Sequence, residues 1–167
     1  MNNIKQKPMM SISLKKDYET GKLLEVGTSI ILNNNIISTT LFKVKENCKY
    51  DNNKYDNVIS YGKIVYISMK KLKEMFKFFS KQYTFLGHDK SYTKKVFRLL
   101  SKLSLHDKNF IDIRRLYSII NGNISTLLSL DDIVQNKGYI IGNNELKNSS
   151  NRSYYAAHLY INYRKDM

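Results

Sequence analysis

The stretch that most constrains the fold runs from Asp112 to Ile141 and predicts two short helices joined by a tight turn. Asp112 is suited to cap the first helix, because its carboxylate can accept the unpaired N–H groups of the opening turn. Apolar residues then recur at helical spacing, at Ile113, Leu116, Tyr117 and Ile120. Asn121-Gly122 is expected to end this helix, since glycine readily adopts the left-handed conformation of a C-terminal cap.

The second helix of this stretch should be capped by Ser125 or Thr126 and stopped by Lys137-Gly138. Its apolar stripe consists of Leu127, Leu130, Ile133 and Val134. Tyr139–Ile141 is then expected to begin a strand, and Ser153–Tyr163 alternates in the manner of a second strand, with the polar residues 142–152 between them. Two helices followed by a hairpin is the layout of a winged helix-turn-helix domain.

The N-terminal part of the chain predicts a small antiparallel β-sheet. Ser11–Val26 has two short segments around a turn at Glu19–Lys22, where glycine supplies the positive φ. Thr28–Leu32 and Ile36–Val44 repeat the pattern around three asparagines. The polar, aperiodic stretch that follows, 46–57, resembles a linker. We therefore expect an α+β protein with an N-terminal β-hairpin region and linker over 1–57 and a winged-helix domain over 58–167.

Between these two parts the pattern predicts a strand over 58–67 and two amphipathic helices over 68–83 and 91–104. The first helix has apolar residues at Met69, Leu72, Met75, Phe76, Phe79 and Tyr83. The second has them at Tyr92, Val96, Leu99, Leu100 and Leu103. Lysines cover much of the remaining surface of both helices.

Charge is the unusual feature of the composition. The 167 residues include 28 Lys+Arg and 14 Asp+Glu, a net charge of +14. Residues 61–110 alone carry 12 basic and 3 acidic side chains. Such an excess favours an anionic partner, either nucleic acid or an acidic membrane surface. The length is sufficient for one domain with a substantial core.

The sequence favours a cytoplasmic protein that does not enter a membrane. Cys48 is the only cysteine, so no internal disulfide can form, and this fits a reducing compartment. The chain has neither a secretory leader pattern nor an apolar run near the roughly 18 residues that a span requires.

The candidate DNA contacts fall into three groups. Positions facing the major groove and nearby phosphates in the helix-turn-helix are Arg114, Arg115, Asn123, Ser125, Thr126, Ser129 and Lys137. Lys147 and Arg152 lie in the expected wing. Lys94, Lys95 and Arg98 lie on the basic face of the 91–104 helix. Tyr154 and Tyr160 are candidates for stacking on bases of an opened strand.

The alternative interpretation of these groups is structural: an ordinary helical pair, solvated lysine faces and tyrosines at the edge of the core. Asp131 and Asp132 favour it, because acidic side chains in the second helix would repel phosphates.

Catalytic and metal-binding patterns are weak, so we expect no enzyme activity, no metal and no cofactor. The three histidines are far apart in sequence and lack metal-site spacing. Asp132 followed by Glu145 and Lys147 loosely matches the carboxylate and E-x-K spacing of restriction-type nucleases, but it lies in a polar segment. The chain has no P-loop motif.

The order of elements resembles that of the small winged-helix replication initiators of Gram-positive plasmids and related phage proteins. The resemblance lies in the hairpin DYETGKLLEV, the two helices before FIDIRRL, the helix-turn-helix ending QNKGYI and the terminal strand. The resemblance implies a non-enzymatic protein of a mobile element that binds plasmid origin DNA and recruits host replication proteins. Independently of it, we expect double-stranded DNA as the ligand and keep a homodimer open as one arrangement. The resemblance places Ser125, Thr126 and Ser129 on the base-reading side, and Lys147 and Arg152 in the wing. A transcriptional regulator, an assembly protein that does not read DNA sequence, a metal-dependent nuclease and an RNA ligand remain alternatives.

Overall fold

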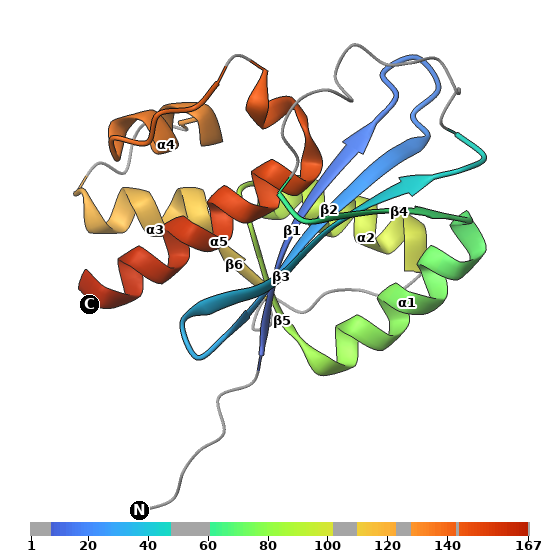
Figure 1. Cartoon of the computed structure of the whole chain (residues 1–167), viewed down its shortest axis with the longest axis horizontal. Coiled ribbons are helices and arrows are strands. Elements are labelled where there is room, and N and C mark those ends of the chain that lie inside the picture. The colour runs from blue at the N-terminus through green and yellow to red at the C-terminus, as the bar shows by residue number, and fades with distance from the viewer. Residues whose placement is uncertain (1–7, 48–60, 102–109, 123–127, 143, 167) are drawn as a thin grey trace, which may run out of the picture.

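In the computed structural model, a mixed six-stranded sheet lies between two layers of helices (Figure 1). The structure describes residues 8–47, 61–101, 110–122, 128–142 and 144–166. The strands are β1 (Met9–Lys16), β2 (Leu23–Leu32), β3 (Asn35–Val44), β4 (Lys63–Ile67), β5 (Thr84–Gly87) and β6 (Phe110–Asp112). The helices are α1 (Met69–Gln82), α2 (Lys90–Ser101), α3 (Ile113–Ile120), α4 (Leu130–Asn136), the short 3₁₀ helix η2 (Glu145–Lys147) and α5 (Ser149–Asp166). The expected α+β class is confirmed, with a larger sheet than the sequence predicts.

The first three strands form the antiparallel hairpins that the sequence predicts. Gly21 has φ +65° in the first turn, and Asn33 and Asn34 have φ 51° and 59° in the second. Two consecutive residues with positive φ match the right-handed twist of the flanking strands, which is why asparagines suit this turn. The difference from expectation is that β2 runs without interruption through Gly27.

The complete sheet has the order β4-β3-β2-β1-β5-β6, in which only β2 runs opposite to the other strands. β4 pairs with β3, and β5 pairs with β1, so residues on both sides of the expected boundary at 57 contribute to one sheet. The short strands β5 and β6 were not predicted. Each has at most four residues beside a helix, so neither shows a period of its own.

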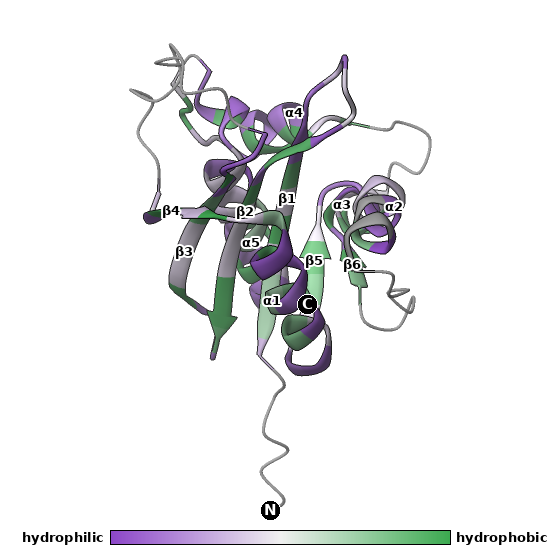
Figure 2. Cartoon of the chain, turned by 90° about the vertical axis from the view of Figure 1, so that its right-hand side faces the viewer, coloured by the Kyte–Doolittle hydropathy of each residue, from purple (hydrophilic) through white to green (hydrophobic). Residues whose placement is uncertain are grey.

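Helices α1 and α2 cover one face of the sheet, as the amphipathic pattern requires (Figure 1). Leu72 and Phe76 of α1 and Phe97 of α2 are fully buried against strand residues such as Met10 and Phe85. Figure 2 shows polar residues on the outer side of α1 and hydrophobic residues along the strands. Both helices are close to their predicted ranges. Tyr92 departs from the prediction, since it is 38% exposed, whereas Thr93 is buried.

Helix α5 covers the other face of the sheet, and α3 and α4 pack beside it. Asp112 caps α3 as predicted, its Oδ1 accepting hydrogen bonds from the backbone N–H of Arg114 and Arg115. The predicted stripe of the second helix is buried at Leu130, Ile133 and Val134, but the cap is Ser129. The predicted caps Ser125 and Thr126 lie outside the described residues.

The expected wing is not formed by the described residues. Tyr139–Ile141 has no strand, and the prediction of a strand over Ser153–Tyr163 is wrong because these residues belong to α5. Both sets of alternating residues in this segment are largely apolar, and α5 is buried on nearly all sides, between the sheet and the α3–α4 pair. A helix enclosed in this way loses its 3.6-residue hydrophobic period, and a period of two can then be mistaken for a strand.

Candidate nucleic-acid interface

The carboxyl ends of β1 and β5 are the place in this sheet where a ligand site is expected. These two parallel strands are neighbours. From β1 the chain turns back to β2 on one side, whereas from β5 it continues through α2 to β6 on the other side. The loops therefore leave in opposite directions and open a crevice outside the strand ends, the usual ligand position in open α/β sheets.

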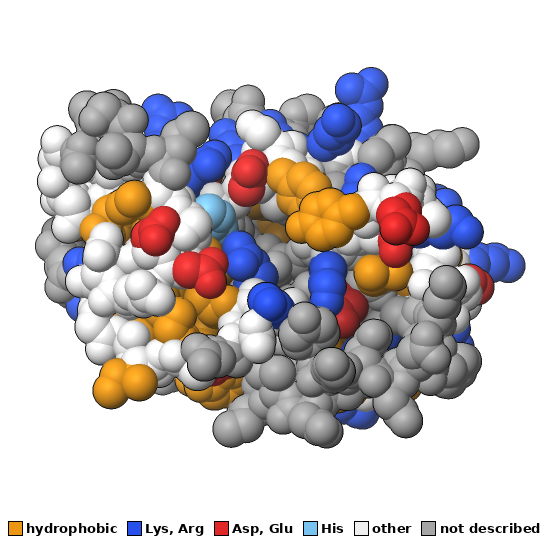
Figure 3. Space-filling view, turned by 90° about the horizontal axis from the view of Figure 1, so that it is seen from above, with side chains coloured by type: hydrophobic (Ala, Val, Ile, Leu, Met, Phe, Trp, Pro, Cys, Tyr) orange, Lys and Arg blue, Asp and Glu red, His pale blue; other side chains and the backbone are white. Residues whose placement is uncertain are grey.

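A cleft of about 960 Å³ occupies this position. Its walls are the end of β1, the β1–β2 turn, the start of α2, the start of α4, η2 and the first turns of α5. Figure 3 shows Lys and Arg, acidic, histidine and hydrophobic side chains gathered around a hollow on this side of the molecule. The cleft thus joins segments from four separate parts of the chain.

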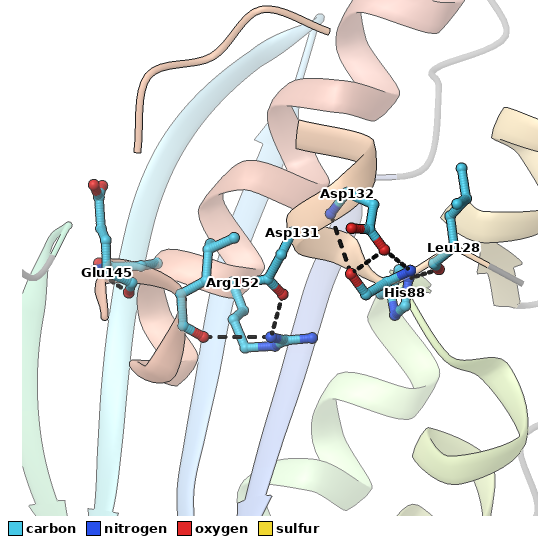
Figure 4. Close-up of polar contacts among 9 residues, drawn as sticks. His88, Leu128, Asp131, Asp132, Glu145 and Arg152 are labelled. Carbon is cyan, nitrogen blue, oxygen red and sulfur yellow. Dashed lines mark hydrogen bonds and ion pairs between the residues drawn. The ribbon is translucent and has the colours of Figure 1, made fainter. Parts of the chain in front are cut away.

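Arg152, in the first turn of α5, is held in place on one side of the cleft (Figure 4). Its Nη1 lies 3.5 Å from Asp131 Oδ2 and donates to the carbonyl oxygen of Leu146 over 3.3 Å. The side chain remains 32% exposed. Because a guanidinium carries five N–H donors, these two contacts leave further donors for an anion.

His88 follows β5 and forms part of the same wall. Its Nε2 lies 3.0 Å from the carbonyl oxygen of Leu128, so an Nε2–H donates there (Figure 4). Burial is the main cause that lowers the pKa of His88, and Arg152 and Arg114 lower it further, while the hydrogen bond to Leu128 and the charge of Asp112 oppose the shift. We therefore expect a neutral imidazole at pH 7.

The three carboxylates of the cleft each make contacts within the fold. Asp17 Oδ1 accepts hydrogen bonds from the backbone of Glu19 and Thr20 in the β1–β2 turn. Asp89 Oδ1 accepts from the backbone N–H of Tyr92, and Asp131 pairs with Arg152. The basic residues that line the cleft are Lys15, Lys16, Lys147 and Arg152. Four cations against three engaged carboxylates leave the cleft mildly attractive to anions.

A larger concentration of positive charge lies on α1 and α2, which contact each other on one face of the sheet. We call their outer sides the basic helical surface. Residues 69–101 contain nine basic side chains and two acidic ones, Glu74 and Asp89. The basic ones are Lys70, Lys71, Lys73, Lys77, Lys81, Lys90, Lys94, Lys95 and Arg98. The first turn of α2 also lines the cleft, so α2 connects the two features.

The predicted DNA contacts are distributed over three places. Lys94, Lys95 and Arg98 lie on the basic helical surface, and Lys147 and Arg152 lie in the cleft instead of a wing.

The remaining predicted contacts belong to the α3–α4 side or are not described. Arg115 is exposed, and Arg114 Nη2 lies 4.0 Å from Asp89 Oδ2. Lys137 Nζ lies 5.1 Å from the ring centre of Tyr163. Ser129 Oγ accepts from Asp132 N and donates to Asp132 Oδ2 in a capping box. Asn123, Ser125 and Thr126 lie outside the described residues.

The carboxylates considered for a nuclease make separate structural contacts. Asp132 belongs to the α4 capping box, whereas Glu145 accepts hydrogen bonds from the Tyr155 hydroxyl and the Gly142 N–H. In Figure 4, Arg152 lies between Glu145 on one side and His88 and Asp132 on the other, where His88 contacts Leu128 and Asp132 belongs to its own capping box. Within the described part of the chain, no three His, Cys, Asp or Glu side chains are grouped to hold a metal ion.

Sequence reasoning did not find the cleft residues Lys15, Lys16, Tyr18, His88 and Tyr92 as a group. The available signal was the presence of polar residues directly after two apolar strand segments, at 15–18 and 88–89. This signal points to a common site only if β5 is known to pair with β1. β5 has only four residues and follows a helix, so the sequence does not reveal that pairing.

Among the helices that the structure describes, none is long and apolar enough to cross a membrane. No model of a known protein family matches the sequence, and a search of curated proteins found no match either.

Proposed function

We propose that this chain is a non-enzymatic nucleic-acid-binding protein whose basic helical surface contacts the phosphate backbone. The observation that carries the proposal is the placement of the two lysine-rich helices next to each other on one face of the sheet. Seven of the nine basic side chains of α1 and α2 are exposed, and the two helices that carry them are neighbours. A surface of this kind binds phosphates through counterion release, without reading bases.

The proposal moves the main contact away from the predicted base-reading helix. In the structure α4 begins with Asp131 and Asp132 in its first turn, and no described strand hairpin follows it. Acidic groups at that position repel a phosphate backbone, whereas α1 carries five lysines and one glutamate. Control of replication or transcription in a mobile element is the biological setting that we propose for such binding, with duplex DNA as the leading ligand.

Two triple variants test the proposal. Both change the net charge by the same amount, but they reverse charges on different faces of the protein. The first variant is Lys73→Glu/Lys77→Glu/Lys95→Glu, at three exposed positions of α1 and α2. The matched control is Arg115→Glu/Lys137→Glu/Lys165→Glu, at exposed positions in α3, at the C-cap of α4 and in α5. Binding to mixed-sequence duplex DNA is measured by fluorescence anisotropy at low salt.

We expect the first variant to weaken duplex binding by at least about tenfold and the control to weaken it much less, because only the first removes phosphate contacts. Equal losses would indicate that net charge alone attracts DNA. A larger loss in the control would place the interface on the α3–α4 side. Absence of wild-type binding to any nucleic acid at low salt would overturn the proposal and favour an assembly protein.

A further inference from the structure

Two tyrosines line the cleft in addition to its charged residues, one from the β1–β2 turn and one from the first turn of α2. Tyr18 lies in the turn and its side chain is fully exposed, at 103%. Tyr92 lies in the first turn of α2 and is 38% exposed. The earlier candidates are less suitable: Tyr160 is only 7% exposed, and Tyr154 stacks on Tyr61 at 4.0 Å between ring centres.

Hydrogen bonds within the turn that carries Tyr18 hold its backbone in a defined position. Asp17 Oδ1 accepts hydrogen bonds from Thr20 N at 2.7 Å and from Thr20 Oγ1 at 2.9 Å. The backbone N–H of Gly21 donates to the carbonyl oxygen of Asp17 over 2.9 Å. Full exposure of an aromatic ring gains nothing for folding, because burial is what makes such a ring stabilising.

Tyr92 is positioned by the N-terminal cap of α2. Its backbone N–H donates to Asp89 Oδ1 over 2.8 Å. Lys16 Nζ lies 5.9 Å from the centre of its ring, a cation–π distance. Burial is the main cause that raises the pKa of Tyr92, and the charges of Tyr18 and Asp89 raise it further. The lining of the cleft therefore includes two tyrosine rings, and a lysine lies against one of them.

Basic side chains of the kind that bind phosphate lie within the same cleft. Lys16 lies against the Tyr92 ring, and Arg152 on α5 keeps donors beyond those engaged by Asp131 and Leu146. Stacking rings beside cations that follow a backbone are the combination that holds unpaired nucleotides, since every base has an aromatic face. A duplex cannot use such rings, because its bases are already stacked on one another.

We propose that the cleft at the carboxyl ends of β1 and β5 binds single-stranded nucleic acid, with unpaired bases on Tyr18 and Tyr92 and their phosphates near Lys16 and Arg152. This inference rests on the proposed nucleic-acid-binding function and adds a second site to the basic helical surface. The protein then holds a junction between duplex and single strand, with the duplex on α1 and α2 and the open strand in the cleft.

The test compares a single strand of about 12 nucleotides, carrying one 2-aminopurine, with the duplex of the same sequence. DNA and RNA strands are measured in parallel. Stacking on a ring quenches 2-aminopurine fluorescence, so this readout reports base contact separately from affinity. The variants are Tyr18→Ala/Tyr92→Ala, the ring-preserving control Tyr18→Phe/Tyr92→Phe, and Lys16→Gln.

We expect the alanine pair to lower single-strand affinity by about 5-fold to 150-fold for each base that loses its stack. It should also abolish quenching and leave duplex affinity unchanged. The phenylalanine pair should retain both properties. Lys16→Gln should reduce the single-strand salt slope by about 0.7, as expected for one phosphate contact.

Single-strand binding and quenching that survive the alanine pair would overturn this inference, while duplex binding sensitive to the α1–α2 charge reversal would still uphold the proposed function. Failure of the wild-type protein to bind either ligand at low salt would overturn both.

Discussion

Gly27, in the middle of β2, allows the sheet to approach the start of α5 more closely than any residue with a side chain would permit. A Cβ built on Gly27 would lie 1.8 Å from the carbonyl oxygen of Ser149 and 2.5 Å from the backbone nitrogen of Ser150. Both neighbours are backbone atoms of residues that are almost fully buried. Gly27→Ala therefore cannot be accommodated by rotating a side chain.

The size of the effect follows from the required movement. Ordinary contact begins near 3.4 Å, so the first turn of α5 must move away by roughly 1.6 Å. Such a shift strains the buried hydrogen bond of 3.1 Å between Ser29 Oγ and Ser153 Oγ. Overpacking typically costs about 1–3 kcal/mol, and a lost buried hydrogen bond adds about 1 kcal/mol. Reduced chain entropy in the unfolded state returns about 0.4–1 kcal/mol, so we expect a net loss of about 1–3.6 kcal/mol.

Thermal and urea unfolding followed by circular dichroism measure this loss, and for a chain of this size it corresponds to roughly 2–14 °C in Tm. Gly142→Ala is the matched control, because its Cβ would lie 3.5 Å from Glu145 Oε2, an ordinary contact. We expect the control to stay within about 0.5 kcal/mol of wild type. Wild-type stability in Gly27→Ala would refute the close approach of β2 and α5. The same variant should also weaken single-strand binding, since Arg152 moves with α5.

Three further outcomes follow from the described contacts. Phe76→Ala should cost about 3–5 kcal/mol in urea unfolding, because Phe76 is fully buried and its ring centre lies 5.4 Å from that of Phe97; a loss below about 1 kcal/mol would contradict the α1 packing. Asp112→Ala should cost about 1 kcal/mol, whereas Asp112→Asn should preserve most of the cap. Burial lowers the pKa of His88 and of His158 in the folded protein, so the unfolded chain binds protons more readily. The contribution of the two neutral histidines to the free energy of unfolding is therefore fully present above about pH 6.5. It should fall as the pH decreases, by at most about 1.4 kcal/mol per pH unit for each histidine. His88→Gln should reduce this slope, and an unchanged slope would contradict the assignment.

Local signals made much of the fold predictable. The two hairpins depend on Gly21 and on Asn33-Asn34, whose positive φ is a property of the turn itself. The α3 cap at Asp112 likewise depends on adjacent backbone, and α1 shows a clear amphipathic period. In each case the residues that decide the structure lie within a few positions of one another.

Non-local structure could not be read in the same way. The α5 residues Tyr155, Ala156 and Ala157 are all buried because the sheet and the α3–α4 pair enclose the helix from different sides. That arrangement depends on how distant segments pack, and it removed the helical period. The pairing of β5 with β1 likewise depends on a crossover through α1.

Of the candidate site, only the excess of basic residues could be predicted from the sequence. The concentration of basic residues over 61–110 was evident from composition, and the structure places its helices on one face. The cleft brings together Lys16, Tyr92 and Arg152, which are separated by 60 or more residues in sequence. Arg152 was selected for a wing, and its position in the cleft follows from α5 being a helix.

The salt dependence of duplex binding tests the central claim most directly. If about four lysines of the basic helical surface contact phosphates, the plot of log Kobs against log salt should have a slope near −3.6. Lys73→Glu/Lys77→Glu/Lys95→Glu should bring this slope markedly closer to zero, while the control on α3, α4 and α5 should retain it. A nearly flat wild-type slope, or the same slope in all three proteins, would contradict a phosphate-binding surface on α1 and α2.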